Sequence, residues 1–163
     1  MAYEGIVASD VKAGDSLPEL AIDVEPVTIV LGAMASRDWR PQHHDYKFAT
    51  GNNGVQDIFM NTPNLAAWFE RYVTDWTGPF GRMGWIRFRM KDSVFPGESM
   101  VFGGKVLGVD TDDQGCAWAE VELELKAGGR VTTVCTARVA IPQDAGDNPW
   151  KRQGDDWRPR AAA

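Results

Sequence analysis

Both histidines of the chain, His43 and His44, lie in one polar stretch that runs from Arg37 to Asp45. His43 follows Asp38 by five residues, so a loop could bring this carboxylate and this imidazole to one water molecule. A positioned carboxylate orients or deprotonates water, and an imidazole moves protons near neutral pH. The pair therefore suits the addition of water across a double bond.

Two other interpretations of this stretch stay open on spacing alone. The first is a solvated surface loop without a chemical role. The second is a metal site built from His43, His44 and a carboxylate, although adjacent histidine side chains rarely point at one ion. We expect no metal, and we interpret His44 and Asp45 as structural or supporting residues, because neighbours on an extended loop point in different directions.

The segments that precede this stretch are short. Leu17 to Pro26 alternates apolar and polar residues, as a half-buried strand does, and Pro26 interrupts it. The apolar run Val27 to Ser36 fits either a buried strand or a short helix, and we favour the helix. Arg37 to Asn61 is polar and lacks periodicity, which predicts a long irregular segment of the kind that often carries function.

The stretch from Thr62 to about Trp76 predicts the main helix. Asn or Thr can cap a helix and Pro63 suits a first turn, whereas Gly78-Pro79 ends it. Apolar residues recur at spacings of three and four and give the helix a broad buried face. Three aromatic residues on it could line a large apolar pocket, but their helical spacing favours a place in the core: Trp68, Phe69 and Tyr72.

Four strand-like segments follow the helix: Met83 to Met90, Ser99 to Val109, Ala117 to Leu125 and Val131 to Ile141. Clusters of Gly, Pro and Asp separate them and suit antiparallel reversals. The sequence thus predicts an α+β fold in which one antiparallel sheet wraps around one long helix, the hot-dog arrangement.

We expect one globular domain over residues 1–145 and a polar C-terminal tail over residues 146–163. Pro, Gly and charged residues without periodicity predict that the tail stays out of the core. Trp150 and Trp157 either dock on a neighbouring surface or leave the tail loosely packed. Cys116 and Cys135, without a C-x-x-C spacing, are expected to be buried strand thiols.

Composition excludes several classes of function. The 163 residues carry 17 basic and 23 acidic side chains, a net charge of -6, which does not suit a nucleic-acid partner. No apolar run approaches the roughly 18 residues of a membrane span, and the N-terminus lacks the features of a signal peptide. We therefore expect a soluble cytoplasmic protein.

The segment Asp38-Trp39-Arg40-Pro41-Gln42-His43 resembles the hydratase motif of the MaoC-like family, Gly-Asp-x-Asn-Pro-aliphatic-His, with Asp, Pro and His in register. The resemblance extends over about residues 15–142 through Asp45, Ala49, Gly54 and Ile58, and Pro96-Gly97-Glu98 is similar to the turn that precedes a strand in that family.

Three positions depart from the motif. Its Gly is Arg37, its Asn is Arg40, and the His-Gly that opens the family's helix reads Met60-Asn61. D-I-F-M-N and R-Y-V-T-D-W-T-G-P make the chain similar to the small MaoC-like subunit of actinobacterial steroid side-chain hydratases.

The resemblance implies an enoyl-CoA hydratase with Asp38 and His43 as its catalytic pair and with Asn61 and Gly54 in substrate binding. The Asn61 backbone N–H would donate a hydrogen bond to the thioester oxygen, while the Asn61 side chain could cap the helix. No cofactor is implied, because CoA belongs to the substrate. A larger MaoC-like subunit would complete a heterodimer or heterotetramer and much of the pocket for a steroid acyl-CoA.

Other functions on the same fold remain open: a homodimeric general acyl-CoA hydratase or dehydratase, an acyl-CoA thioesterase, and a structural subunit without catalytic work. The spacing of Asp38 and His43 favours hydration. Four arginines could contact CoA phosphates, and nothing in the sequence selects among them: Arg37, Arg40, Arg82 and Arg87.

Overall fold

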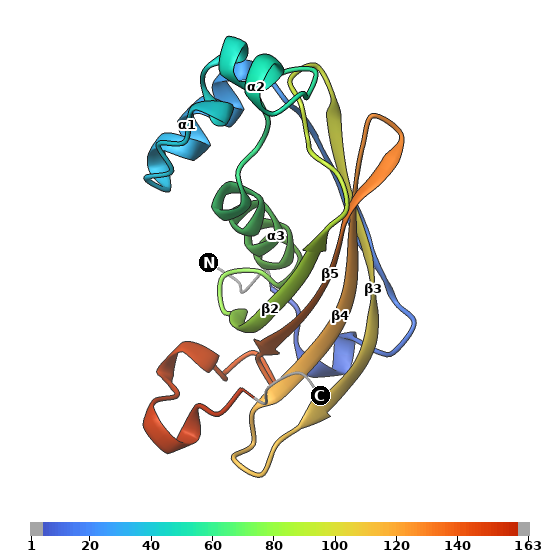
Figure 1. Cartoon of the computed structure of the whole chain (residues 1–163). Helices are drawn as coiled ribbons and strands as arrows, with labels where there is room; N and C mark the ends of the chain where they lie inside the picture. The colour runs from blue at the N-terminus through green and yellow to red at the C-terminus, as the bar shows by residue number, and fades with distance from the viewer. Residues whose placement is uncertain (1–4, 160–163) are drawn as a thin grey trace.

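The computed structural model describes residues 5–159, which form one antiparallel sheet curved around a long helix (Figure 1). Its elements are β1 (Ser16–Asp23), α1 (Pro26–Ala35), α2 (Tyr46–Asn52), α3 (Thr62–Thr77), β2 (Arg82–Met90), β3 (Ser99–Thr111), β4 (Ala117–Ala127) and β5 (Arg130–Ile141). The strand order is β1-β3-β4-β5-β2. Every strand and helix predicted from the sequence is present, and the predicted hot-dog arrangement is confirmed.

Alternation along the strands gives the sheet its buried face. In β4, Val121, Leu123 and Leu125 are buried, whereas Glu122 between them is exposed. Because neighbouring strand residues point to opposite faces, one face carries apolar side chains for α3 and the other carries charges. Both cysteines are buried, as predicted, and Cys135 lies in the strand β5, whereas Cys116 directly precedes β4.

The helix α3 fills the curve of the sheet. Phe69 is fully buried and packs edge-on against Phe102 of β3, with 5.2 Å between the ring centroids. The Tyr72 hydroxyl donates a hydrogen bond to Pro18 O of β1 at 2.9 Å. Burial, followed by the charge of Glu19, raises the pKa of Tyr72 to about 12. The helix thus contacts β3 and the edge strand β1.

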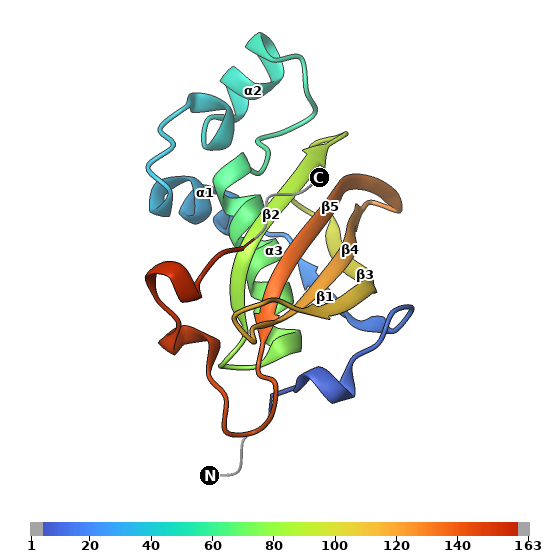
Figure 2. The same ribbon diagram turned by 90° about the horizontal axis from the view of Figure 1, so that it is seen from below.

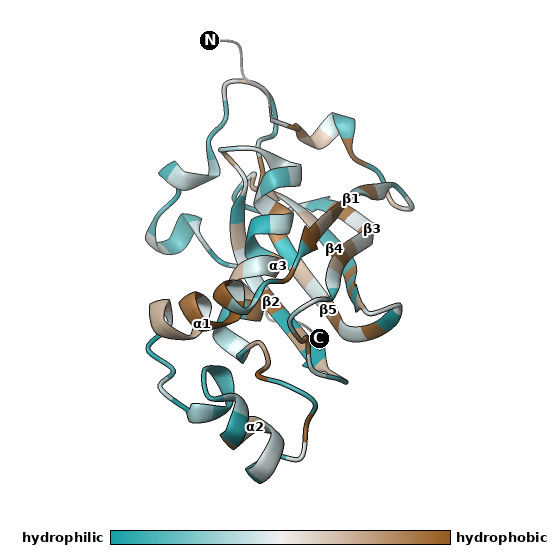
Figure 3. Cartoon of the chain, turned by 90° about the horizontal axis from the view of Figure 1, so that it is seen from above, coloured by the Kyte–Doolittle hydropathy of each residue, from teal (hydrophilic) through white to brown (hydrophobic). Residues whose placement is uncertain are grey.

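The helices α1 and α2 lie together at one end of α3, away from the C-terminal segment (Figures 1 and 2). Asn64 Nδ2 of α3 donates to Thr28 O of α1 at 3.3 Å. A Cβ at Gly32 would lie 1.9 Å from Asn64 Nδ2, so the close approach of α1 to α3 requires glycine there. The opposite side of α1 is apolar and exposed, and the helix is brown along its length in Figure 3.

The prediction of an irregular segment from Arg37 to Asn61 is wrong in part. The structure places a 3-10 turn at Pro41–His43 and the helix α2 at Tyr46–Asn52. Asp45 caps α2 by accepting a hydrogen bond from Phe48 N at 3.1 Å. Only Ala49 of α2 is buried, so the helix has no apolar periodicity by which the sequence could reveal it.

The C-terminal tail stays out of the main core and docks on the sheet, one of the two alternatives open for its tryptophans. Trp157 packs on Trp118 of β4, with 5.0 Å between ring centroids, and Pro149 is buried. The Arg82 guanidinium lies 3.6 Å from the Trp157 ring centroid and donates hydrogen bonds to the carbonyls of Pro149 and Arg152. Residues up to 159 therefore dock on the end of the sheet opposite α2 (Figure 1). Within residues 5–159, no helix has the length and apolar character needed to cross a membrane.

Candidate active site

The fold brings Asp38 and His43 together, as predicted. Asp38 lies just beyond α1, and its N–H donates to Ala33 O at 2.9 Å. His43 ends the 3-10 turn Pro41–His43, and its Nε2 lies 3.5 Å from Asp38 Oδ2. The end of α1 and this short turn thus place a carboxylate beside an imidazole.

A backbone carbonyl fixes the His43 ring. Its Nδ1 lies 2.7 Å from Phe59 O, and the ring packs at 5.0 Å against the Phe59 ring. A carbonyl oxygen only accepts hydrogen bonds, so Nδ1 carries the hydrogen, and Nε2 of the neutral ring is an acceptor. His43 is 4% exposed, and its Nε2 faces Asp38. Two acceptors side by side suit a molecule that donates two hydrogens, such as water.

The surroundings of Asp38 favour its ionised form. Desolvation acts to raise the pKa of Asp38, but a hydrogen bond from Asn61, one from the Arg40 N–H and the charges of His43 and Arg40 together hold that pKa below its usual value. The Asp38 side chain is 19% exposed, whereas that of Arg40 is 75% exposed. Asp38 is therefore an anion at neutral pH, with a side chain that is partly exposed to solvent.

Asn61 joins this pair from the start of α3. Its Nδ2 donates to Asp38 Oδ2 at 3.2 Å and to Ser36 Oγ at 2.8 Å. The proposed capping role of its side chain is wrong, because that side chain makes no capping hydrogen bond to α3. Within the described residues, the Asn61 backbone N–H has no hydrogen-bond partner, so an unpaired donor lies at the N-terminus of the helix.

Comparison with known proteins finds a relative of known activity. No family model matches the sequence. The chain is 36% identical over 97 residues to the 3-oxo-4,17-pregnadiene-20-carboxyl-CoA hydratase beta subunit of Mycobacterium tuberculosis, and this match covers 60% of the chain and 74% of that protein.

Solved structures that are similar to this chain agree with the sequence match. A chain of the ChsH1-ChsH2 complex from Mycobacterium tuberculosis matches with a TM-score of 0.71 and 28% identity, over 79% of this chain and 97% of that one. A MaoC-like dehydratase from Rhodospirillum rubrum shares the fold, with a TM-score of 0.73 and 18% identity over 86% and 99% of the two chains. This chain belongs to the MaoC-like hydratase family. The predicted family and enzyme class are confirmed.

The other residues predicted around the MaoC-like site are less closely involved. Gly54 has a φ of 67° just beyond α2, a conformation that favours glycine, and no contact in the described structure joins it to Asp38 or His43. Its part in substrate binding stays a prediction. His44 is exposed, and Asp45 caps α2. Among the described residues, no group of three His, Cys, Asp or Glu side chains could hold a metal ion.

Ser36 is a site residue that the sequence reasoning missed. Its hydroxyl donates to Gly32 O at 2.7 Å and accepts from Asn61 Nδ2. A serine directly after the apolar run of α1 and two residues before Asp38 was the available signal, because serine hydroxyls often bond to carbonyls one turn back. Its contact with Asn61, however, joins residues from two helices.

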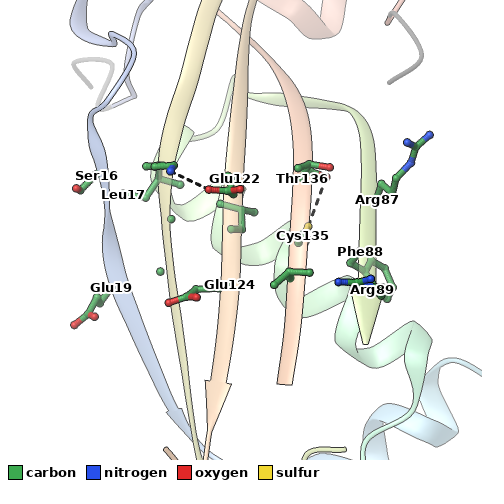
Figure 4. Close-up of a pocket in the computed structure, with 15 residues that line it drawn as sticks. Ser16, Leu17, Glu19, Arg87, Phe88, Arg89, Glu122, Glu124, Cys135 and Thr136 are labelled. Atoms are coloured by element: carbon green, nitrogen blue, oxygen red, sulfur yellow. Dashed lines mark hydrogen bonds and ion pairs between the residues drawn. The ribbon is translucent and has the colours of Figure 1, made fainter. Parts of the chain in front are cut away.

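The arginines differ in their availability to a ligand. Arg82 is held by the tail through its hydrogen bonds and its contact with Trp157, so the structure argues against a role of Arg82 in CoA binding. Arg87 and Arg89 border a hollow of about 900 Å³ on the sheet face away from α3 (Figure 4). None of the four predicted site residues lines this hollow, so we do not place the MaoC-like active site there.

Proposed function

We propose that this chain is the catalytic small subunit of a heteromeric enoyl-CoA hydratase that acts on a steroid side-chain acyl-CoA. The observation that carries the proposal is the approach of Asp38 and His43 to 3.5 Å, with Asn61 beside them at the start of α3. The relative named as a pregnadiene-carboxyl-CoA hydratase beta subunit supports the substrate class and the presence of a second subunit. The match to a chain of the ChsH1-ChsH2 complex supports the same assembly.

The geometry suggests how the pair would handle protons. A water molecule donates one hydrogen to the Asp38 carboxylate and one to His43 Nε2. As the water oxygen bonds to the β-carbon, Nε2 takes the proton, and the nearby Asp38 anion stabilises the imidazolium that forms. The imidazolium then returns this proton to the α-carbon, so H and OH are added across the double bond.

Negative charge builds on the thioester oxygen during this addition. A donor that already points at the oxygen stabilises the transition state more than the ground state. The Asn61 backbone N–H lacks a partner among the described residues and lies where the helix dipole also favours negative charge. We propose that this N–H donates a hydrogen bond to the thioester oxygen.

The test is hydration of an α,β-unsaturated steroid acyl-CoA, followed by the loss of enoyl-thioester absorbance, with the chain alone and with a larger MaoC-like subunit. Activity that appears in the mixture but not with the chain alone supports the proposal. Activity of the chain alone on short enoyl-CoA would replace it with a general homodimeric hydratase. Release of free CoA thiol would replace it with a thioesterase.

The two adjacent histidines supply a matched pair of variants. We expect His43→Gln to lower kcat of the active complex by about 10² to 10⁴, the usual effect of removing a positioned acid or base. His44→Gln should keep wild-type activity, because His44 is exposed and its side chain makes no described contact with Asp38. A complex that tolerates both His43→Gln and Asp38→Asn would show a purely structural subunit.

A further inference from the structure

The Asn61 side chain is placed in an unusual way for a residue at the start of a helix. It is 1% exposed, and both of its Nδ2 hydrogens are used, one on Ser36 Oγ and one on Asp38 Oδ2. Its Oδ1 is buried and has no hydrogen-bond partner within the described residues. A buried acceptor without a partner costs free energy, so another interaction must hold the amide in this orientation.

The charge of Asp38 supplies that interaction. If the amide turned over, Oδ1 would face the Asp38 carboxylate, and two acceptors would lie against each other. In the observed orientation, the amide donates to an anion, and such hydrogen bonds are about twice as strong as those between neutral groups. The orientation of the Asn61 side chain is thus matched to an ionised Asp38.

Ser36 fixes the other side of the amide. Its hydroxyl hydrogen points to the last turn of α1, at 2.7 Å from Gly32 O and 3.2 Å from Ala33 O. Its oxygen can therefore only accept from Asn61 Nδ2. Ala33 O also accepts a hydrogen bond from the Asp38 N–H at 2.9 Å. The end of α1 therefore holds both the Asp38 backbone and the Ser36 hydroxyl that contacts Asn61.

We propose that the Asn61 side chain and the Ser36 hydroxyl form a positioning device that holds the Asp38 carboxylate toward His43. This inference rests on the proposed function, in which Asp38 is the carboxylate of the catalytic pair. The MaoC-like motif has His-Gly where this chain has Met60-Asn61, so the amide is a feature that the motif itself lacks. Asn61 would then serve the site twice, through its backbone N–H and through its side chain.

The other groups around Asp38 act differently from this amide. His43 Nε2 faces the carboxylate from the 3-10 turn at 3.5 Å, and Arg40 Nε lies 4.0 Å away on a largely exposed side chain. The Arg40 N–H donates to Oδ1 at 3.4 Å, a long hydrogen bond. Asn61, whose side chain is almost fully buried, is therefore the neutral side-chain donor that should matter most to the position and ionisation of Asp38.

The first measurement needs no partner subunit and no substrate. The carboxyl carbon of Asp38 is titrated by NMR in the full chain, with Asp38→Asn to assign its signal. Removing a donor destabilises the ionised carboxylate, so Asn61→Gly should raise the pKa of Asp38, and Ser36→Ala should raise it less. Ser36→Thr keeps the hydroxyl and should titrate as the wild type does. An unchanged pKa in both Asn61→Gly and Ser36→Ala, with folding verified by thermal melting, would overturn the proposal.

The second measurement uses the active complex. We expect Asn61→Gly and Ser36→Ala to lower kcat by about 10-fold to 100-fold with little change in KM, and to move the acidic limb of the kcat profile to higher pH. Ser36→Thr should restore both values. If Asp38→Asn abolishes turnover while the other variants keep the wild-type profile, only the positioning device is refuted. If Asp38→Asn stays active, the proposed function itself is wrong.

Discussion

Arg37 lies between Ser36 and Asp38 in a backbone conformation that side chains rarely adopt. Its φ is 56°, and it is the one non-glycine residue with a positive φ in the described chain. The MaoC-like motif has glycine at this place. The turn that carries the chain from α1 to Asp38 is therefore kept, although the residue that normally allows it has been replaced.

The strain at Arg37 leads to a prediction about stability. Arg37→Gly relieves a left-handed conformation worth about 1–2 kcal/mol but adds freedom to the unfolded chain, worth about 0.4–1 kcal/mol. We expect a free energy of unfolding between that of the wild type and about 1.6 kcal/mol above it. Arg37→Val should lose about 1 kcal/mol or more, because a β-branched residue fits this region poorly.

Urea denaturation measures these differences, and Arg40→Gly is the control. Arg40 has an ordinary φ of -68°, so glycine there should only destabilise the protein. Equal losses of stability in Arg37→Gly and Arg40→Gly would show that the conformation of Arg37 carries no strain.

At the scale of elements, the C-terminal segment contributes more than its polar composition indicates. Trp157 fills the space between Trp118 and the Arg82 guanidinium, and Trp150 Nε1 donates to Gly81 O at 3.1 Å. These contacts fasten the segment to the start of β2 and to the start of β4. A cation over an aromatic ring stabilises such a contact, and burial of the rings adds to it.

The two tail tryptophans should therefore differ in their contribution to stability. We expect Trp157→Ala to lower the free energy of unfolding by about 1–3 kcal/mol, because it removes a ring that packs on both Trp118 and Arg82. Trp150 is 55% exposed, so Trp150→Ala should cost only about 0.5–1.5 kcal/mol, the net value of one hydrogen bond. Urea denaturation of both variants checks this order, and a smaller loss at Trp157 than at Trp150 would contradict the docking of Trp157 on Trp118.

At the scale of the whole molecule, several carboxylates tie stability to pH. Desolvation acts to raise the pKa of Asp112, but hydrogen bonds from the Trp118 indole and from the N–H groups of Cys116 and Gln114, with the charge of Arg152, hold this pKa below its usual value. Asp38 and Asp92 are also lowered. A carboxylate with a lowered pKa stabilises the fold above its unfolded pKa, and this contribution is lost as the pH falls through the folded pKa.

We therefore expect the chain to keep its full stability down to about pH 4, near the pKa of an unfolded Asp, and to lose it progressively below that value. Asp112→Asn should be less stable than the wild type at pH 7, and the difference should shrink at lower pH as the wild-type carboxylate is protonated. Thermal melting from pH 7 to pH 2 measures both curves. A difference that stays constant over this range would show that the charge of Asp112 does not stabilise the fold.

The strands, the helix α3 and the approach of His43 to Asp38 could be predicted from the sequence alone. Alternating residues in β4 and the three-and-four spacing in α3 are local patterns, and local patterns dictate which face of an element is buried. The Asp38 to His43 spacing lies within one loop, so their approach was also predictable. The helix α2 was not, because its cap at Asp45 and its single buried residue leave no periodic signal.

The support of the Asp38 side chain depends on contacts between separate elements. The bond between Asn61 and Ser36 spans 25 residues and exists because α1 packs closely on α3 where Gly32 meets Asn64. The docking of Trp157 on Trp118 likewise depends on where the sheet ends in space. Spacing along a chain predicts which residues share a face or a loop. Contacts between separate elements depend on how those elements pack, and only the folded chain fixes that.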